Sequence, residues 1–143
     1  MIIRQLNIKN FGKIHDKTLE FSPGINVLYG ENESGKTTIH TFIKSMFFGL
    51  TRMRGKAARN DTYSTYEPWE NPGQYGGTIW FNSKGHNYRL SRNFQKDHAF
   101  SELLNEDTKE LADIDAVGLE KVLGNVSEAV YDNTVSVAQL KSV

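Results

Sequence analysis

Apolar residues alternate with polar ones at the start of the chain, and this two-residue period predicts a strand over residues 2–9. Phe11-Gly12-Lys13 interrupts the alternation, and a second strand is predicted over residues 18–21. The turn residues Ser22-Pro23-Gly24 lead into an apolar run at 25–29, which predicts a third, buried strand.

A helix and a hairpin are predicted downstream. Over residues 37–48 the apolar positions recur at intervals of three and four, as on one face of a helix. Residues 51–75 show little periodicity and are predicted to form a long loop, which in a compact domain usually indicates function or disorder. A β-hairpin is predicted over residues 76–92, with strands at 76–82 and 86–92.

The last third of the chain carries shorter patterns. A further strand is predicted over residues 100–104, and two short helices near 119–123 and 127–132. The apolar residues at 134–140 predict one more buried strand.

The segment between the third strand and the helix carries a nucleotide-binding motif. Residues 30–37, Gly-Glu-Asn-Glu-Ser-Gly-Lys-Thr, match the full Walker A pattern G-x-x-x-x-G-K-[ST]. A strand before the loop and a helix after it form the context that this motif requires, so binding of the phosphates of ATP or GTP with Mg²⁺ is predicted. The candidate nucleotide-binding residues are Gly30, Asn32, Glu33, Ser34, Gly35, Lys36, Thr37 and Thr38.

Each residue type in this loop suits a phosphate ligand. Gly30 and Gly35 let the backbone approach closely, so that N–H groups converge on phosphate oxygens. Lys36 is the candidate catalytic cation at the β- and γ-phosphates, and the Thr37 hydroxyl is the candidate Mg²⁺ ligand. Thr38 either assists at the α-phosphate or only starts the helix.

Composition narrows the remaining function classes. The 143 residues suffice for one compact domain or for part of a larger one, and 17 basic residues balance 17 acidic ones, so net charge selects no partner. The absence of cysteine excludes disulfides and cysteine-based sites. No run approaches transmembrane length and the start is unlike a secretory signal, so we expect a cytoplasmic protein without a membrane partner, compatible with nucleoid association.

The order of the elements resembles that of an ATP-binding-cassette head. The phosphate loop follows two predicted strands that pair antiparallel, whereas a small GTPase or a simple nucleotide kinase normally places it after its first strand. The resemblance is to the N-terminal half of an SMC-like ABC ATPase head, closest to the SbcC/YhaN-type branch linked to DNA double-strand-break repair. It is carried by Ile8-Lys9-Asn10-Phe11-Gly12-Lys13, by Phe21 to Gly30 leading into GENESGKTT, by Tyr66-Glu67-Pro68-Trp69, by Gly76-Gly77 and by Val130 to Gln139.

The resemblance implies a fold and further site residues. Residues 1–143 would form the N-terminal lobe of an α/β P-loop NTPase, with a mixed parallel and antiparallel sheet and a β-hairpin. The segment 134–140 is similar to the family's Q-loop, in which Gln139 would contact Mg²⁺ or the attacking water; alternatively Gln139 only ends a strand. Residues 11–13 would border the adenine, although Gly12 stands where related heads can carry an arginine.

Motifs needed for hydrolysis are missing from these 143 residues. No apolar strand ends in Asp-Glu as a Walker B strand does, and no LSGG-type signature or switch histidine occurs. In SMC-like proteins these lie in a C-terminal half beyond a long coiled coil, so the chain is interpreted as half of a head. Its expected partners are that C-terminal half, a second head in an ATP-dependent dimer, a nuclease subunit and DNA. ATP and Mg²⁺ are the expected cofactors, with weak binding and negligible turnover by this chain alone.

Two features of the predicted long loop suggest alternative roles. A basic cluster would contact the DNA backbone, form a lid over the nucleotide or remain a solvated loop; its members are Arg52, Arg54, Lys56 and Arg59. An aromatic group would stack on unpaired bases or, as we favour, pack onto the domain's own hairpin; its members are Tyr63, Tyr66, Trp69 and Tyr75.

Two alternatives stand beside a DNA-repair or chromosome-maintenance ATPase. One is the ATP-binding cassette of a transporter, and the other is a stand-alone nucleotide-binding regulatory module that does not hydrolyse. The Ile-x-Asn-Phe-Gly opening and the Pro-Trp pair favour the DNA-repair class.

Overall fold

The computed structural model describes residues 2–21, 33–50, 61–71 and 73–112, with the side chains of 33–36 excepted. Its elements are β1 (Ile2–Phe11), β2 (Ile14–Glu20), α1 (Glu33–Phe48), α2 (Thr62–Tyr66), β3 (Gly76–Ser83), β4 (His86–Asn93), β5 (Phe100–Asn105) and β6 (Glu110–Ala112). The strands predicted at 25–29 and 134–140 and the helices predicted near 119–123 and 127–132 lie outside the described residues.

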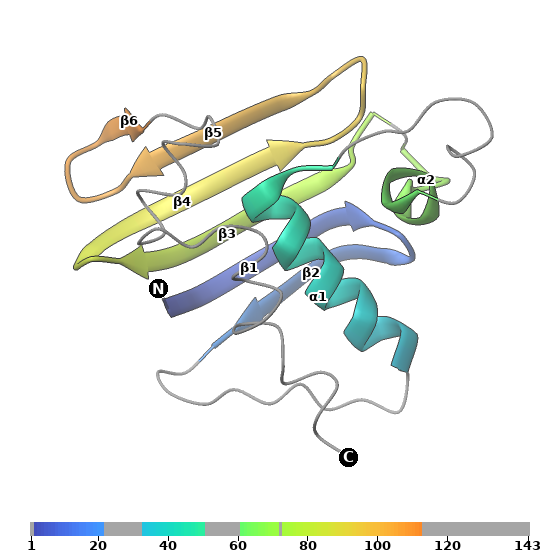
Figure 1. Cartoon of the computed structure of the whole chain (residues 1–143), viewed down its shortest axis with the longest axis horizontal. Coiled ribbons are helices and arrows are strands. Elements are labelled where there is room, and N and C mark those ends of the chain that lie inside the picture. Colours follow the sequence, from blue (N-terminus) through green and yellow to red (C-terminus); the bar gives the residue numbers. More distant parts are fainter. Residues whose placement is uncertain (1, 22–32, 51–60, 72, 113–143) are drawn as a thin grey trace.

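The six strands form one sheet in the order β2-β1-β3-β4-β5-β6, and every neighbouring pair is antiparallel (Figure 1). The α/β class is confirmed, but the prediction of a mixed parallel and antiparallel sheet is wrong for the described residues. Four of the five pairings join strands that are consecutive in the chain. Connections as short as those after β1, β3 and β5 can only return a strand antiparallel to its neighbour.

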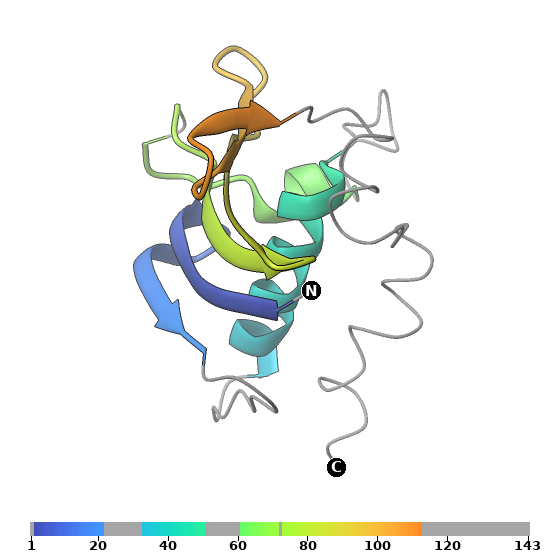
Figure 2. The same ribbon diagram turned by 90° about the vertical axis from the view of Figure 1, so that its left-hand side faces the viewer.

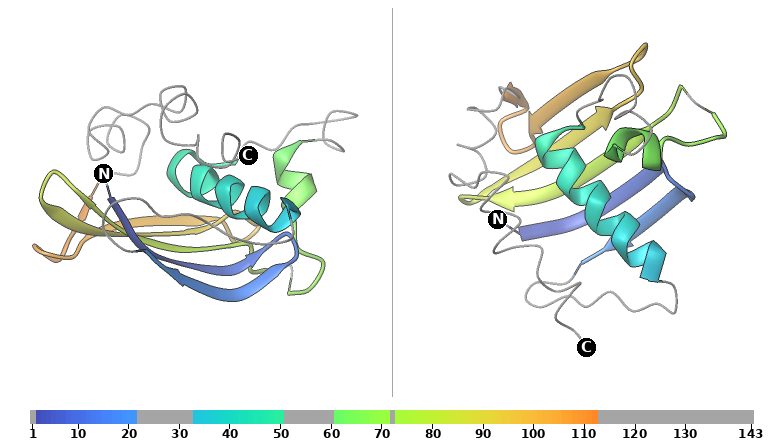
Figure 3. Two further views of the ribbon diagram at one scale, coloured as in Figure 1. Left: turned by 90° about the horizontal axis from the view of Figure 1, so that it is seen from below. Right: turned by 45° about the vertical axis from the view of Figure 1, so that its right-hand side comes forward.

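Alternation along the central strands divides the sheet into an apolar and a polar face. In β1, Leu6 and Ile8 are fully buried, whereas Asn7 between them is only half-buried. In β3 the same period buries Ile79 and Phe81. Both helices lie on the apolar side, with α1 crossing the central strands (Figures 2 and 3). An antiparallel sheet with one covered and one solvated face has this pattern.

The core lies between α1 and the apolar face of the sheet. Its buried hydrophobic residues come from α1, from the four strands β1, β3, β4 and β5, and from the segment around α2. They are Leu6, Ile8, Phe11, Ile39, Phe42, Ile43, Met46, Phe47, Tyr63, Tyr75, Ile79, Phe81, Leu90 and Leu103. Each large aliphatic or aromatic side chain among them contributes about 1.5–3 kcal/mol relative to exposure, so this layer fixes where α1 lies.

The C-terminal end of α1 is capped by backbone and side-chain donors. Gly49 adopts φ +83° and its N–H donates to Ser45 O at 2.7 Å, the left-handed termination that favours glycine. The Arg92 guanidinium of β4 donates through Nε to Met46 O at 2.5 Å. Burial lowers the pKa of Arg92 from its ordinary value. A cation at the last helical carbonyls also complements the helix dipole.

The segment predicted to be a long loop contains α2, which begins after the N-cap Asp61, whose carboxylate accepts from Ser64 N–H at 2.7 Å. Of the aromatic group in this segment, Tyr63 and Tyr75 are buried, and the Tyr75 hydroxyl donates to Tyr63 O at 2.8 Å. Burial raises the pKa of Tyr75, which keeps this donor protonated. Packing, rather than base stacking, is therefore the role of these two tyrosines.

Within the described segments, none of the helices combines the length and the apolar character needed to cross a bilayer.

Candidate nucleotide site

The helix α1 begins at Glu33, inside the Walker A motif and four residues before the predicted start. Residues 30–32 lie outside the described part, and for residues 33–36 the backbone alone is described. The first N–H groups of a helix have no intrahelical acceptor and carry a partial positive charge. The described start of α1 thus directs donors toward the segment in which the phosphate loop is predicted.

Thr37 and Thr38 are the two predicted site residues whose side chains are described. Both are half-buried in the first two turns of α1, and both take part in interactions within the chain. His40 lies one turn further on, and burial lowers the pKa of its imidazole below the ordinary 6.5. His40 is therefore neutral at pH 7 and adds no charge to this end of the helix.

The turn between β1 and β2 packs beside Thr38. Gly12 in this turn has φ +59°, and its N–H donates to Tyr66 O at 2.7 Å. A Cβ added to Gly12 would lie 3.1 Å from Cδ1 of Tyr66 and 3.5 Å from Cγ2 of Thr38. The position therefore requires glycine for its conformation and for space, and Lys13 is the first exposed cation of the turn.

Phe11 is a core residue, which corrects the expectation that its side chain borders the adenine. Its ring is fully buried, stacks on Tyr66 with centroids 5.0 Å apart, and meets Phe42 edge-on at 5.4 Å. Of the segment 11–13, only Gly12 and Lys13 are accessible at the surface.

Asn10 is an organising residue that sequence reasoning missed. It is 2% exposed, and its Nδ2 donates to Glu70 O at 2.7 Å and to Gln74 O at 2.9 Å. Its Oδ1 pairs with Nδ1 of His15 at 2.5 Å. The available signal was an amide in phase with Leu6 and Ile8 on the buried face, because a buried amide must be hydrogen-bonded.

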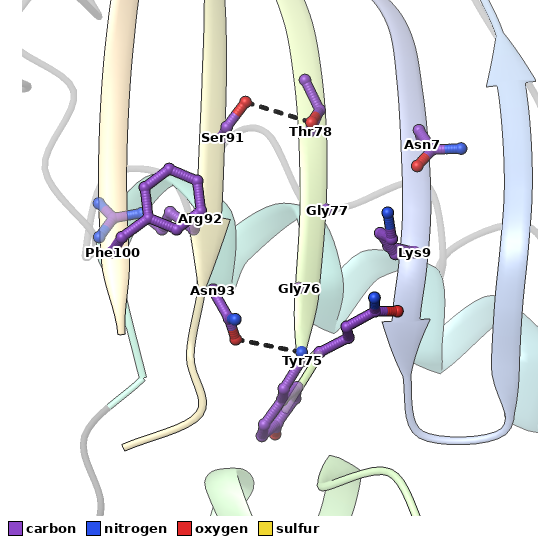
Figure 4. A pocket seen from close by; sticks show the side chains of 11 residues that line it. Asn7, Lys9, Tyr75, Gly76, Gly77, Thr78, Ser91, Arg92, Asn93 and Phe100 are labelled. Carbon is purple, nitrogen blue, oxygen red and sulfur yellow. Dashed lines mark hydrogen bonds between the residues drawn. The ribbon is translucent and has the colours of Figure 1, made fainter. Parts of the chain in front are cut away.

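A hollow of about 300 Å³ lies on the sheet face opposite α1 (Figure 4). It is lined by Asn7, Lys9, Gly77, Thr78, Ser91 and Phe100, among other residues. The Thr78 and Ser91 hydroxyls bond each other at 3.2 Å, and two cations of this sheet pair with acids, Arg4 with Glu106 and Arg89 with Glu102. This hollow is separate from the start of α1 and is not the candidate phosphate site.

The other predicted site residues lie outside the described part of the chain. They are Gly30, Asn32, Gln139 and the basic cluster Arg52, Arg54, Lys56 and Arg59. For Glu33, Ser34, Gly35 and Lys36, the structure gives their place in the first turn of α1 and no side-chain geometry.

Comparison with known proteins gives a consistent family assignment. Residues 5–122 match the family described as the AAA domain. The chain is 38% identical to the uncharacterized protein YhaN of Bacillus subtilis over 78 residues. This alignment covers 54% of this chain and 7% of YhaN. It is 31% identical over 150 aligned positions to the DNA double-strand break repair Rad50 ATPase of Sulfurisphaera tokodaii, covering 99% of this chain and 16% of that protein.

A third relative is the DNA replication and repair protein RecF of Lachnoclostridium phytofermentans, 37% identical over 60 residues, covering 42% of this chain and 16% of RecF. The chain thus spans between 7% and 16% of the length of these relatives. These matches confirm the resemblance to the N-terminal segment of SMC-like DNA-repair ATPases.

Proposed function

The chain belongs to the AAA domain family, and from that premise we propose that it is the ATP-binding N-terminal segment of an SMC-like ATPase acting in DNA repair or chromosome maintenance. The observation that carries the proposal is the start of α1 at Glu33, within the Walker A motif. The N–H groups of its first turn, which have no acceptor within the helix, would then serve the phosphates together with the glycine loop. The names of the relatives, Rad50 and RecF, favour DNA repair over membrane transport.

The residue types of the Walker A motif suit a nucleotide with Mg²⁺. Lys36 holds the β- and γ-phosphates as a mobile point charge, and the Thr37 hydroxyl ligates the metal. Gln139 is assigned to Mg²⁺ or to the water near the γ-phosphate. Bound Mg²⁺ supplies neutralisation of the phosphate charge.

We expect nucleotide binding by this chain to occur without efficient hydrolysis. The 143 residues contain no Asp-Glu Walker B end and no signature motif, which are the motifs that supply the water-activating carboxylate in this family. Turnover would require the C-terminal half of the same head and a second head across the nucleotide. A nuclease subunit and DNA are further proposed partners, with the basic cluster in 51–60 as the candidate DNA contact.

The experiment is a titration of the purified chain with a fluorescent ATP analogue, with and without Mg²⁺. Lys36→Ala should abolish binding, and Thr37→Val should remove the Mg²⁺-dependent part, because each deletes one assigned contact. Lys17→Ala is the matched control, since Lys17 is an exposed lysine of the edge strand β2 and should leave affinity unchanged.

Two results would contradict the proposal. The proposed nucleotide site would be contradicted if the chain showed no Mg²⁺-dependent binding of the ATP analogue. It would also be contradicted if Lys36→Ala and Lys17→Ala lost affinity equally. Rapid ATP hydrolysis by this chain, lost in Lys36→Ala, would leave the site but overturn the expectation of negligible turnover.

A further inference from the structure

Trp69 is exposed in a segment whose other aromatic residues are packed. Trp69 is 98% exposed, whereas Tyr63 and Tyr75 are only 3% and 1% exposed. Tyr66 stacks on Phe11 and is half-buried. The three tyrosines of this segment thus take part in packing, whereas the Trp69 indole remains exposed to solvent. The surface around it, residues 67–71, is called the Trp69 loop below.

The Trp69 loop is held in place on both sides of the indole. Upstream, the Tyr66 carbonyl accepts from Gly12 N–H at 2.7 Å, and Pro68 is buried. Downstream, the Glu70 carbonyl accepts from the Asn10 amide at 2.7 Å. The Asn71 carbonyl accepts from Gln74 N–H at 2.8 Å. Because both neighbours of Trp69 are anchored, burying its indole against a partner would order few further backbone torsions.

The charged residues nearest to Trp69 along the chain are acidic. Glu67 and Glu70 are both exposed and flank Trp69 in the chain. No lysine or arginine occurs in the sequence from residue 61 to residue 83. This arrangement opposes the approach of a nucleic acid backbone and attracts cationic side chains. An indole face also binds guanidinium and ammonium groups directly, through cation–π attraction.

We propose that the Trp69 loop is a docking site for a protein partner whose surface presents an apolar pocket rimmed by arginine or lysine side chains. Trp69 enters the pocket, and Glu67 and Glu70 pair with the basic rim. Tryptophan anchors of this kind dominate the affinity of many interfaces, while the charged rim sets the rate and partner choice. The site lies at the end of the sheet beyond β1 and α2 (Figure 3), and it does not depend on nucleotide binding.

The test uses the purified chain and three fluorescein-labelled probes followed by anisotropy. They are an amphipathic helical peptide of leucine and arginine, the same peptide with glutamate in place of arginine, and a fifteen-nucleotide oligo(dT). The leucine–arginine peptide should bind, and Trp69→Ala should weaken it at least about tenfold, the loss expected of an interface anchor. Glu67→Gln with Glu70→Gln should weaken it less and reduce its salt dependence.

The matched control is Phe100→Ala, which removes another exposed aromatic side chain, 52% exposed in β5, and should leave peptide affinity unchanged. Unchanged thermal unfolding of Trp69→Ala would exclude a folding defect, as its exposure leads us to expect. The proposal would be overturned by no binding of the leucine–arginine peptide, by equal binding in Trp69→Ala, or by equal binding of the leucine–glutamate peptide. Tighter, Trp69-dependent binding of oligo(dT) would overturn it in favour of a nucleic acid site.

Discussion

At the residue scale, the Asn10 amide joins two segments that are sixty residues apart in the chain. Asn10→Ala would leave the Glu70 and Gln74 carbonyls without their donor at a site that is 2% exposed. Losing these two part-buried hydrogen bonds should lower the free energy of unfolding by about 1–3 kcal/mol in total. Urea denaturation of Asn10→Ala should show a loss of this size.

Asn7→Ala is the control for Asn10. Asn7 donates to the Thr18 hydroxyl at 3.0 Å at an exposed site, where water replaces the lost partner. Its loss should stay within about 0.5 kcal/mol. Equal destabilisation by the two substitutions would mean that the Asn10 amide does not organise the 70–74 segment.

Gly12 and Gly85 provide a matched pair for separating backbone strain from crowding. Both have positive φ, +59° and +82°, so alanine at either position should cost about 1–2 kcal/mol for the left-handed conformation. A Cβ at Gly85 meets no atom within 4 Å, whereas one at Gly12 lies 3.1 Å from Tyr66. Gly12→Ala should therefore lose at least about 1 kcal/mol more than Gly85→Ala in urea denaturation. Equal losses would show that Tyr66 moves away freely.

Sequence reasoning reached Asn10, Phe11 and Gly12 as a motif but not the role of each residue. The two-residue period predicts that Asn10 shares a face with Leu6 and Ile8. Its acceptors lie at residues 70 and 74, and no local pattern connects positions so far apart in sequence. The segment 11–13 was expected to border the adenine because related heads bind the base near their first strands, whereas the structure buries the Phe11 ring in the core.

At the element scale, Arg92 links β4 to the end of α1. Arg92→Ala would remove charged donors from Met46 O and Phe47 O and should lower the free energy of unfolding by about 1.5–3 kcal/mol. Arg89→Ala, on the same strand, removes a partly exposed ion pair with Glu102 and should cost less than about 1 kcal/mol. Thermal and urea unfolding of both variants compare the two, and an equal loss would argue against capping by Arg92.

The elements found from the sequence are those with a strong period. The helix was predicted to end at residue 48 as observed, but its start at Glu33 falls in the glycine loop, before the apolar period begins. β2 is an exposed edge strand with polar residues on both faces, so only part of it was predicted. The five residues of α2 and the three of β6 are too few to display a period.

At the scale of the whole molecule, the sequence located the candidate site better than it predicted the sheet. The Walker A spacing is set by phosphate chemistry and is visible in eight consecutive residues. Strand direction depends on which segments become neighbours, and five antiparallel pairings follow from connections that the motif does not encode. The packing of residues 61–75 against β1 likewise depends on long-range contacts, which is why a structureless loop was expected there.

The stability of the whole domain should depend on pH in two separate windows. Burial lowers the pKa of His40 below 6.5, so between these two values the unfolded chain binds a proton that the folded chain does not. His40 therefore does not reduce the free energy of unfolding above pH 6.5, and it reduces this free energy as the pH drops below 6.5. The Asp107 carboxylate accepts from Asn87 N–H at 2.9 Å, and mainly this bond lowers its pKa below 3.8. Its contribution is retained above pH 3.8 and lost as the pH falls through the folded-state pKa.

Urea midpoints measured across the acid range in three chains separate the two groups. His40→Gln should flatten the profile just below pH 6.5 and leave the lower window unchanged, because glutamine does not titrate. Asp107→Asn should flatten only the window below pH 3.8, since the amide cannot gain a charge-assisted bond on ionisation. Each variant thus controls for the other. The contributions of all other titratable groups are the same in the three chains, so they cancel when each variant is compared with the parent chain. A parent profile that rises as the pH falls through 6.5, with no change in His40→Gln, would contradict the assignment of a half-buried, neutral imidazole in α1.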